Sequence, residues 1–483
     1  MINITVVIHI LGLLLTLNGA LMLVGLPFSV YYGSPDILPI STASGLTIAV
    51  GLAGWLTTRH SDHTNIGKRE GYLIVSLGWI VLSAFGSLPF IFSGAIPNFT
   101  DAFFETISGF TTTGASILDN IESLPKGILF WRSMTHWIGG MGIIVLSLAI
   151  LPILGIGGMQ LFVAEVPGPT PDKIHPRVKE TAKRLWIIYF MLTLAQTVLL
   201  FVGGMTLFDA INHSFATLAT GGFSTKQASV AHYTSPYIQY VIALFMYFAG
   251  VNFSLHYFAL KRRFSKVWGS EEFKFYTGVI LISTLILTVG LIISQNISLE
   301  QAFRDSLFTT LTIVTTTGFV TADYELWAPF LIFIVFILMF TGGSAGSTGG
   351  GVKMVRHLLI IKNSFVEMKR LLHPRALIPV RLDKRAVPPE VMFNILAFFA
   401  IYILIFIFSA LVMTAIGLDF TSALASVIAS LGNIGPGLGA VGPTQNYAAI
   451  PTAGKWFLSF LMLLGRLELF TVLLILTPAF WRK

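Results

Sequence analysis

The sequence predicts an all-α membrane protein, in which two leading transmembrane helices precede four copies of a helix–half-helix–helix repeat. Its composition excludes an ordinary soluble domain, since 54% of the 483 residues are hydrophobic and only 11% are charged. Ten apolar stretches are long enough to cross a bilayer, which takes about 20 residues of helix. A short motif that ends in glycine recurs four times, always between two of these stretches.

The apolar stretches set the order of the elements and the boundaries of the predicted units. They lie near residues 4–27, 37–58, 71–95, 129–155, 185–207, 236–260, 277–297, 328–354, 391–416 and 455–478. The motif falls between the third and fourth, fifth and sixth, seventh and eighth, and ninth and tenth stretches. We therefore divide the chain into two leading helices (1–66) and four repeats (67–160, 161–268, 269–388 and 389–483). The third repeat includes a long basic linker.

Lysine and arginine are distributed unevenly between the two sides of this arrangement. Lys126, Arg132, Lys226, Arg304 and Lys455 belong to the opposite side, whereas most of the 30 basic residues fall in loops that follow the even-numbered stretches, or at the C-terminus. Because cytoplasmic loops carry the excess of positive charge, this side and both termini are predicted to be cytoplasmic. The four motifs then enter from outside. The formal net charge of +8 is a topology signal and does not indicate nucleic-acid binding.

Each motif begins with a polar residue suited to cap a helix and ends in glycine thirteen positions later, with a small residue six positions before that glycine. The copies run from Asp101 to Gly114, from Asp209 to Gly222, from Asp305 to Gly318 and from Ser422 to Gly435. Asp and Ser are good N-caps because their side chains accept hydrogen bonds from free N–H groups. The residues between form a helix of about 15 Å, half a bilayer. Each motif therefore predicts a half-helix that hands over to an extended loop inside the membrane.

The loops at the ends of these half-helices are candidates for cation binding. Non-helical backbone persists in a bilayer only where protein buries it or where it lines a water-filled path, so four such loops indicate one shared path. Glycine lets a carbonyl turn toward the axis, a ring of carbonyls can replace an ion's hydration shell, and helix C-termini add partial negative charge. The loops contain no carboxylate, which argues against a divalent cation. Four ordinary glycine caps at re-entrant loops are the alternative.

These loops carry the resemblance of the chain to a known family. The segments are Thr-Thr-Thr-Gly-Ala-Ser ending at Ser116, Ala-Thr-Gly-Gly-Phe-Ser ending at Ser224, Thr-Thr-Thr-Gly-Phe-Val-Thr-Ala-Asp ending at Asp323, and Gly-Asn-Ile-Gly-Pro ending at Pro436. Together they resemble the Trk/Ktr/HKT potassium transporters, in particular the bacterial TrkH-type members, over essentially the full length.

The resemblance implies four covalently linked potassium-channel-like pore repeats, with K⁺ as the permeating ion. It also implies a homodimer with one pore in each subunit, and a cytoplasmic nucleotide-binding regulatory ring of the TrkA kind that takes NAD or ATP. The implied ion ligands are Thr112, Thr113, Gly114, Thr220, Gly221, Gly222, Thr316, Thr317, Gly318, Asn433, Ile434 and Gly435. In the family, serine in place of Gly114 goes with sodium permeation, so glycine here favours potassium. No loop has the full Thr-Val-Gly-Tyr-Gly of potassium channels, which predicts weaker selectivity.

The eighth apolar stretch contains a run of small residues that is expected to break its helix. Residues 341–351 read Thr-Gly-Gly-Ser-Ala-Gly-Ser-Thr-Gly-Gly-Gly, and each glycine costs a helix about 1 kcal/mol relative to alanine. The resemblance makes this an intramembrane gating loop, with Gly342, Gly343, Gly346, Gly349, Gly350 and Gly351 as gate residues. Close helix packing through small residues is the alternative. A phosphate-binding loop is excluded, because Val352 stands where that motif needs lysine.

Arg466 lies well inside the last apolar stretch and is the remaining gate candidate. An arginine at the centre of a membrane helix costs about 2.5–3.5 kcal/mol on insertion scales, so it indicates a function. Glu468 is not its obvious partner, because positions i and i+2 do not share a helix face. We expect Arg466 to face the path below the loops as an electrostatic barrier. A structural ion pair with another helix is the alternative.

The sequence therefore predicts a potassium uptake protein of the bacterial inner membrane, surrounded by lipid and gated by a cytoplasmic partner. A symporter that couples K⁺ to H⁺ or Na⁺ is the alternative, since broken helices are also typical of coupled carriers. An enzyme is not expected, because His136 and His256 have no accompanying nucleophile and acid. The chain has no nucleotide-binding motif, so no bound organic cofactor is expected and any nucleotide dependence must come from the partner.

Overall fold

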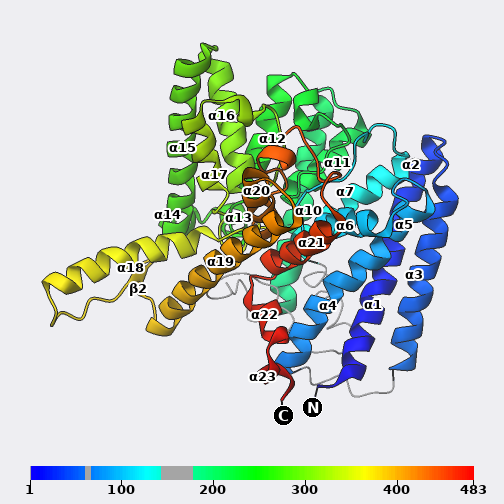
Figure 1. Ribbon diagram of the computed structural model, residues 1–483, viewed down its shortest axis with the longest axis horizontal. Helices are drawn as coiled ribbons and strands as arrows, with labels where there is room; N and C mark the ends of the chain where they lie inside the picture. Colours follow the sequence, from blue (N-terminus) through cyan, green and yellow to red (C-terminus); the bar gives the residue numbers. More distant parts are fainter. Residues whose placement is uncertain (1, 60–66, 143–177, 483) are drawn as a thin grey trace.

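The computed structural model describes residues 2–59, 67–142 and 178–482, and these are almost entirely helical (Figure 1). Two short strands in the described part, β1 (Arg381–Leu382) and β2 (Arg385–Ala386), pair antiparallel at the base of a projecting arm (Figure 1). This architecture confirms the predicted fold class. The predicted boundary between residues 160 and 161 lies outside the described residues.

The two leading helices pack against each other at one side of the molecule. They comprise α1 (Ile4–Met22), continued by the 3₁₀ turn η1 (Leu23–Gly25) and α2 (Leu26–Tyr31), and then α3 (Ile37–Thr57). A Cβ on Gly12 would lie 2.6 Å from the backbone nitrogen of Trp55, and one on Gly51 would lie 2.6 Å from that of Thr16. Close approach through small residues is typical of membrane helices, which lack a hydrophobic force between them.

Four repeats follow, each with a long helix, a half-helix and a second helix. The first has α4 (Lys68–Gly86), α5 (Leu88–Phe92), α6 (Phe99–Phe110) and α7 (Lys126–Met141). The second has α10 (Val178–Val202), α11 (Leu207–Leu218), η2 (Ser229–His232), α12 (Pro236–Ala249) and α13 (Phe253–Leu260). The third has α14 (Phe264–Gly269), α15 (Glu271–Gln295), α16 (Leu299–Val314), η3 (Tyr324–Leu326), α17 (Pro329–Leu338) and α18 (Met354–Leu372). The fourth has α19 (Pro389–Ile416), α20 (Phe420–Leu431), η4 (Gly439–Val441), α21 (Thr452–Arg466), α22 (Phe470–Leu476) and α23 (Pro478–Trp481).

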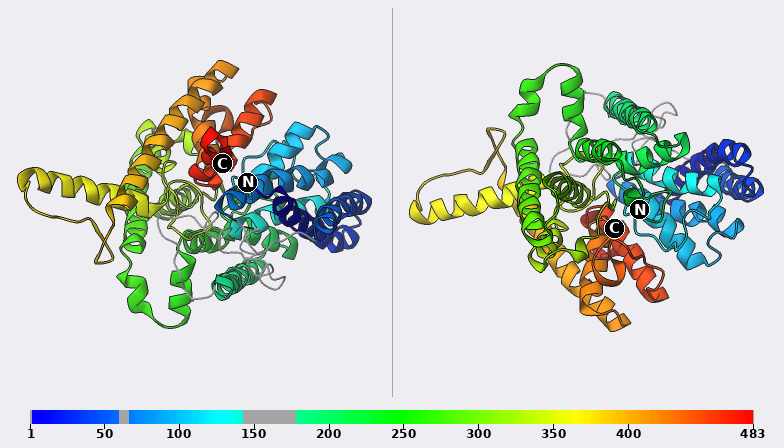
Figure 2. Two further views of the ribbon diagram at one scale, coloured as in Figure 1. Left: turned by 90° about the horizontal axis from the view of Figure 1, so that it is seen from below. Right: turned by 90° about the horizontal axis from the view of Figure 1, so that it is seen from above.

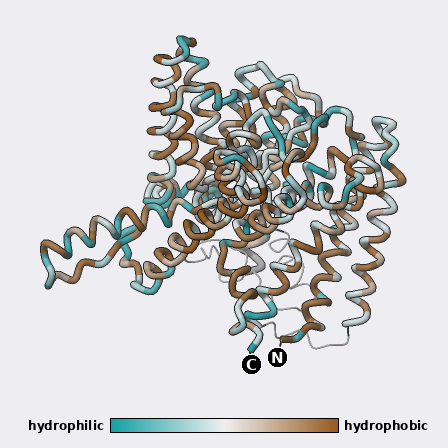
Figure 3. Tube along the Cα trace, viewed as in Figure 1, coloured by the Kyte–Doolittle hydropathy of each residue, from teal (hydrophilic) through white to brown (hydrophobic). Residues whose placement is uncertain are grey.

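The repeats surround a common centre, which is clearest in the views along the bundle (Figure 2). Hydrophobic residues run along the long helices, while hydrophilic residues gather in the loops at both ends (Figure 3). The two ends of the chain lie on the same side (Figure 1). From this bundle α18 and the β1–β2 hairpin project sideways as an arm. The half-helices α6, α11, α16 and α20 lie in the interior, so their C-terminal loops can meet.

The predicted spans are only partly continuous. Six helices of the described chain are long and apolar enough to cross a membrane, and two bent pairs of helices would raise the number to eight. The sixth and tenth predicted spans were expected to be unbroken, but they bend by 102° between α12 and α13 and by 119° between α21 and α22. The eighth is interrupted after α17, as predicted. The fourth runs beyond Gly142 into residues outside the described part.

The bend between α12 and α13 has a clear cause in hydrogen bonding. Asn252 caps α13 by accepting from the backbone N–H of Ser254. The carbonyl of Gly250 accepts from Ser344 at 2.8 Å, and the N–H of Phe253 donates to Gly346 at 3.0 Å. A distant segment of the same chain thus satisfies the backbone groups that the break exposes, as a membrane interior requires.

The predicted N-caps of the half-helices were wrong by about one turn or more. The capping side chains are Asn98 on α6, Thr206 on α11, Ser298 on α16 and Asp419 on α20. In three copies the predicted residue, namely Asp101, Asp209 or Ser422, donates its own backbone N–H to the true cap three positions earlier. Asp305 lies further inside its helix, because α16 is 16 residues long. Asp101 and Asp209 occupy the third helical position, where negative charge also suits a helix start.

Candidate functional site

The four half-helices end in the same way. The second residue after each helix takes a left-handed conformation, with φ of 53° at Thr112, 55° at Thr220, 57° at Thr316 and 53° at Asn433. The next residue donates its N–H five positions back, to Ser108, Ala216, Thr312 or Ala429, at 2.8–2.9 Å. This is the Schellman arrangement, which satisfies carbonyls that a helix end leaves free. The small residue that recurs in the sequence motif supplies the accepting carbonyl.

The left-handed residues are unusual because three of them are threonines. A β-branched residue in this region is a genuine outlier, and such strain costs about 1–3 kcal/mol and persists only where the surroundings impose it. The side chains are fully buried. The Thr316 hydroxyl accepts from the N–H of Gly350 at 2.7 Å, and the Asn433 amide donates to the Thr113 hydroxyl at 3.0 Å and to the Met462 carbonyl at 2.9 Å. Strain repeated at equivalent places indicates a functional constraint.

The four glycines of the motifs close these loops into a ring. Their φ angles are 81°, 79°, 79° and 96°, in the region that favours glycine. A Cβ on each glycine would overlap the carbonyl oxygen of the residue that precedes the motif glycine of the next loop. The pairs are Gly114 against Gly221, Gly222 against Thr317, Gly318 against Ile434 and Gly435 against Thr113. The contacts run once around and return to the start. The structure thus brings all twelve predicted ion ligands together in four glycine loops (residues 112–114, 220–222, 316–318 and 433–435).

A pocket of about 570 Å³ of empty space, including open solvent, adjoins the ring. All four motif glycines line it, together with the residues that follow them, such as Ser116, Phe223 and Pro436. Within the described residues its wall holds Arg132 and Lys226 but no carboxylate. Negative potential at the ring therefore comes from backbone carbonyls at the C-terminal ends of four half-helices, because the described wall of the pocket holds no acidic side chain.

The glycine-rich loop (residues 342–351) lies against the other side of the ring. The Thr348 hydroxyl donates to the carbonyl of Leu218, the last residue of α11, at 2.9 Å. A Cβ on Gly349 would lie 3.0 Å from the carbonyl of Thr315, and one on Gly350 would lie 2.7 Å from the Cβ of Asn433. The loop therefore touches the C-terminal ends of α11, α16 and α20 at once, with no space for side chains at these glycines.

The other predicted gate glycines serve the folding of the loop itself. Gly346 and Gly351 have φ of 72° and 64°. A Cβ on Gly342 would overlap the carbonyl of Gly350, and one on Gly343 would lie 3.0 Å from the carbonyl of Gly250. The loop turns back on itself, and the N–H of Met354 bonds to Gly343 at 3.1 Å as α18 begins.

Arg466 is the last residue of α21 and points into this region. Its guanidinium donates to the carbonyl of Thr348 at 2.8 Å, and to the carbonyls of Gly139 at 2.6 Å and Gly140 at 3.2 Å. It therefore ties the glycine-rich loop to the end of α7, where Gly139 packs against the carbonyl of Phe110, the last residue of the remaining half-helix, α6. Glu468 forms an ion pair with Arg356 at the start of α18.

Comparison with known proteins assigns this arrangement to a family. The model of the family TrkH, described as "Cation transport protein", matches residues 40–483. The chain belongs to the TrkH family. This is a family of transporters and not of enzymes, as the sequence predicted.

Individual relatives match almost end to end. The Trk system potassium uptake protein TrkH of Salmonella typhimurium is 46% identical over 98% of this chain and 99% of its own length. Trk system potassium uptake protein TrkG of Escherichia coli is 34% identical over 100% and 99%. The crystal structure of the potassium transporter TrkH from Vibrio parahaemolyticus covers 100% of both chains at 39% identity, with a TM-score of 0.89.

In this TrkH-family chain, two adjacent carboxylates that the sequence analysis passed over connect the glycine-rich loop to the arm. Glu272 accepts from the N–H of Ala345, inside the loop, at 2.7 Å and from that of Val355, in the first turn of α18, at 3.1 Å. Glu271 pairs with Lys362 and accepts from the N–H of Asp383 at 3.0 Å, in the arm. Both glutamates begin α15, where a helix start favours negative charge.

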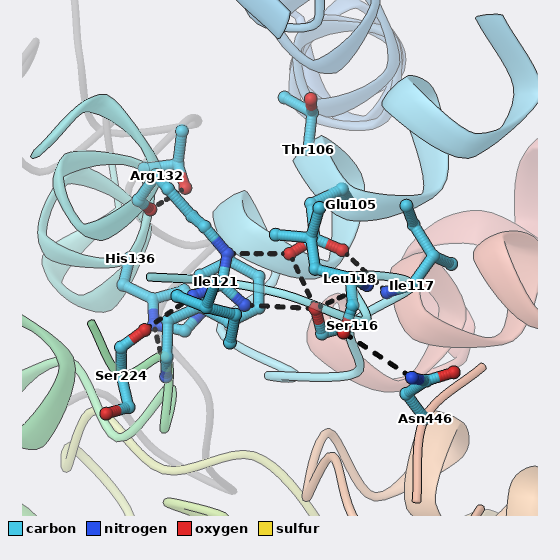
Figure 4. Close-up of polar contacts among 12 residues, drawn as sticks. Glu105, Thr106, Ser116, Ile117, Leu118, Ile121, Arg132, His136, Ser224 and Asn446 are labelled. Atoms are coloured by element: carbon cyan, nitrogen blue, oxygen red, sulfur yellow. Dashed lines mark hydrogen bonds and ion pairs between the residues drawn. The ribbon is translucent and has the colours of Figure 1, made fainter. Parts of the chain in front are cut away.

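The sequence analysis also missed a buried ion pair beside the ring, shown in Figure 4. Glu105 on α6 and Arg132 on α7 are 0% and 2% exposed, and Nε of Arg132 lies 2.7 Å from Oε1 of Glu105. We had placed Arg132 among the loop charges of the outer side. The signal was a carboxylate inside an apolar half-helix, which demands a partner.

Proposed function

We propose that this chain conducts potassium ions through a pore on the axis of the four glycine loops. The observation that carries the proposal is the closed ring, in which each motif glycine packs on the carbonyl preceding the glycine of the next loop. Four carbonyls around one axis can replace the hydration shell of a monovalent cation. The names of the relatives, which are potassium uptake proteins, support potassium as the ion.

The glycine-rich loop is proposed as the gate of this pore. It touches the inner ends of three half-helices, and Arg466 fastens it on the fourth side. In the proposed topology the pocket faces outward and both termini face the cytoplasm of a bacterial cell with an inner membrane. A membrane potential then drives cations inward by about 2.3 kcal/mol per charge for each 100 mV.

Purified protein in liposomes tests the proposal directly. We expect uptake of radioactive rubidium, a potassium analogue, when an inside-negative potential is imposed, with strong competition by external K⁺ and weak competition by Na⁺. Empty liposomes are the control. Equal inhibition by Na⁺ and K⁺ would contradict a potassium-selective ring. Uptake that ceases when proton and sodium gradients are abolished, with the electrical potential kept, would favour the symporter instead.

We further propose two kinds of protein partner. One is a second copy of the chain, with one pore in each subunit. The other is a cytoplasmic nucleotide-binding ring that docks on the arm, where Lys369, Arg370 and Arg375 are exposed or nearly so. Light scattering in detergent tests the dimer. Co-purification with the nucleotide-binding subunit of the same organism tests the ring, and Lys369→Glu with Arg370→Glu should weaken it if the arm is the docking surface.

A further inference from the structure

The Glu105–Arg132 ion pair has more partners than a structural pair needs. Burying two charges costs several kcal/mol per ion, and apolar replacements of a buried pair are often as stable. A pair retained inside the bundle therefore calls for a role besides stability. Each of the three guanidinium nitrogens of Arg132 has a hydrogen-bond partner, as do both carboxylate oxygens of Glu105.

These partners lie in the segments that directly follow the first two glycine loops. Nη1 of Arg132 donates to the carbonyl of Ser224 at 2.9 Å, and Nη2 donates to the Ser116 hydroxyl at 3.1 Å. Glu105 accepts from the Ser116 hydroxyl at 3.0 Å and from the N–H of Ile117 at 2.9 Å. Ser116 and Ser224 each lie two residues after a motif glycine. The pair therefore holds equivalent points of two neighbouring loops at a fixed separation (Figure 4).

Aromatic stacking immobilises the same guanidinium. Arg132 lies over the ring of Phe223, with its Cζ 3.6 Å from the ring centroid, and His136 stacks on that ring at 3.9 Å. Phe223 directly follows the motif glycine of the second loop. Cation–π contact adds about 2 kcal/mol or more when it is desolvated, so the charge, the aromatic ring and the loop form one rigid unit.

The fourth glycine loop is held by neutral groups instead. The Tyr447 hydroxyl donates to the carbonyl of Gly435 at 2.7 Å, and the Tyr324 hydroxyl donates to that of Gly437 at 2.8 Å. The N–H of Tyr447 also donates to the carbonyl of Ser116 at 2.8 Å, which joins this support to the first loop. Among the described contacts, the ion pair thus supports the first and second loops, whereas tyrosine hydroxyls support the fourth.

We propose that Glu105 and Arg132 are positioning residues for ion selectivity, which rests on the proposed function of the ring. They fix the outer ends of the first two loops, so that the carbonyls cannot close around a smaller ion. Glu105 also neutralises Arg132, which lines the pocket at the entrance to the ring. Without that carboxylate, a positive charge faces every incoming cation.

Two single variants and a double variant separate these effects. Glu105→Gln keeps the shape but leaves Arg132 uncompensated, so we expect the preference for K⁺ over Na⁺ to fall about tenfold, as for loss of one charge-assisted hydrogen bond. We also expect a higher K⁺ concentration for half-maximal uptake. Arg132→Lys keeps the charge but cannot reach Ser116 and Ser224 together, so selectivity falls without that change in concentration dependence. Glu105→Gln with Arg132→Gln removes both charges and should restore the concentration dependence but not the selectivity.

The chain supplies a matched control in a second ion pair on α6. Lys455 Nζ lies 2.6 Å from Asp101 Oδ1, one turn before Glu105 and with no contact to the glycine loops. Asp101→Asn should lower the melting temperature of the purified protein and leave selectivity as in wild type.

Rubidium uptake with Na⁺ and K⁺ competition, measured with the melting temperature, decides the matter. Variants at 105 and 132 that melt earlier but keep wild-type competition ratios would overturn the proposal and leave the pair a structural one. An equal change in the competition ratio in Asp101→Asn and in Glu105→Gln would also overturn the proposal. Failure of the proposed function looks different, because wild-type protein itself would then show no preference among the cations. If Glu105→Gln does not fold, Arg132→Lys and the double variant provide the same comparison.

Discussion

Replacing Arg466 should open the proposed pore, for which the glycine-rich loop is the proposed gate. The guanidinium holds the Thr348 carbonyl at 2.8 Å and the Gly139 carbonyl at 2.6 Å, so it bridges the loop and the end of α7. A hydrogen bond to a charged group contributes about 1.5–3 kcal/mol. Since about 1.4 kcal/mol is a factor of ten in an equilibrium constant, loss of the Thr348 bond raises the open fraction of the loop about ten- to a hundredfold. The positive charge acts in the same direction, at about 2 kcal/mol for a cation roughly 8 Å away with an effective dielectric constant of about 20.

Arg466→Gln and Arg466→Lys distinguish the bridge from the charge. Arg466→Gln loses both and should give the larger rise in unregulated rubidium uptake. Arg466→Lys keeps the charge, but its ammonium lacks the planar fork that reaches two carbonyls, so an intermediate rise shows that the bridge contributes. Arg263→Gln, at an exposed arginine of the predicted cytoplasmic side, is the control and should behave as wild type. Well-folded Arg466→Gln protein with uptake at or below the wild-type rate would refute the reasoning. Loss of expression together with a lower melting temperature would instead indicate the structural ion pair that the sequence left open.

Three further predictions follow from the ring and the loop. Serine at any one motif glycine (Gly114, Gly222, Gly318 or Gly435) should lower the K⁺ preference in sodium competition. The reason is that the serine Cβ overlaps a neighbouring carbonyl and that left-handed φ costs a serine about 1–2 kcal/mol. Gly417→Ser, with φ of 114° and open space around it, is the control. Unchanged sodium competition in all four variants would exclude the ring as the ion site. Deleting part of residues 342–351 should raise basal uptake several-fold, and a correctly folded deletion with unchanged or abolished uptake would count against a gate. Glu272→Gln should raise basal uptake about tenfold by weakening two charge-assisted bonds, one to Ala345 in the loop and one to Val355 in α18. Glu390→Gln, on the exposed start of α19, should not.

Local sequence predicted the backbone features well, because each depends on residues close in the chain. The glycine run of residues 341–351 predicted the break after α17, and the four motifs predicted half-helices that end together. The caps were misassigned because Asn98 and Asp101 are both suitable residues, and only the path of the chain decides which one accepts. The bends after Ala249 and Arg466 were missed for a different reason. The first depends on backbone partners that the glycine-rich loop supplies from a distant part of the chain. The second passes through left-handed φ at Glu468 and Leu469, where the sequence has no glycine to indicate a turn.

Side-chain partnerships across repeats were the least predictable part. Arg132 was counted among the charges of an outer loop because it follows Lys126 near a predicted helix start. Its partner Glu105 is 27 residues away and its acceptor Ser224 is 92 residues away. Glu271 and Glu272 gave no periodic signal, since two adjacent acids at a helix start are common. Single-sequence patterns identify such residues as costly in a membrane but do not select their partners.

The directional contacts of the ring have a consequence for how defects combine. Each motif glycine presses on the carbonyl of the next loop, in the order first, second, third, fourth and back to first. Because all four loops belong to one chain, they can be altered one quarter at a time, unlike the filter of a homotetramer. Free energies of neighbouring substitutions should then depart from additivity, as for residues in contact, while those of opposite loops should add. Double-mutant cycles around the ring would thus show which loops are neighbours, in a chain whose four quarters have different sequences and the same backbone.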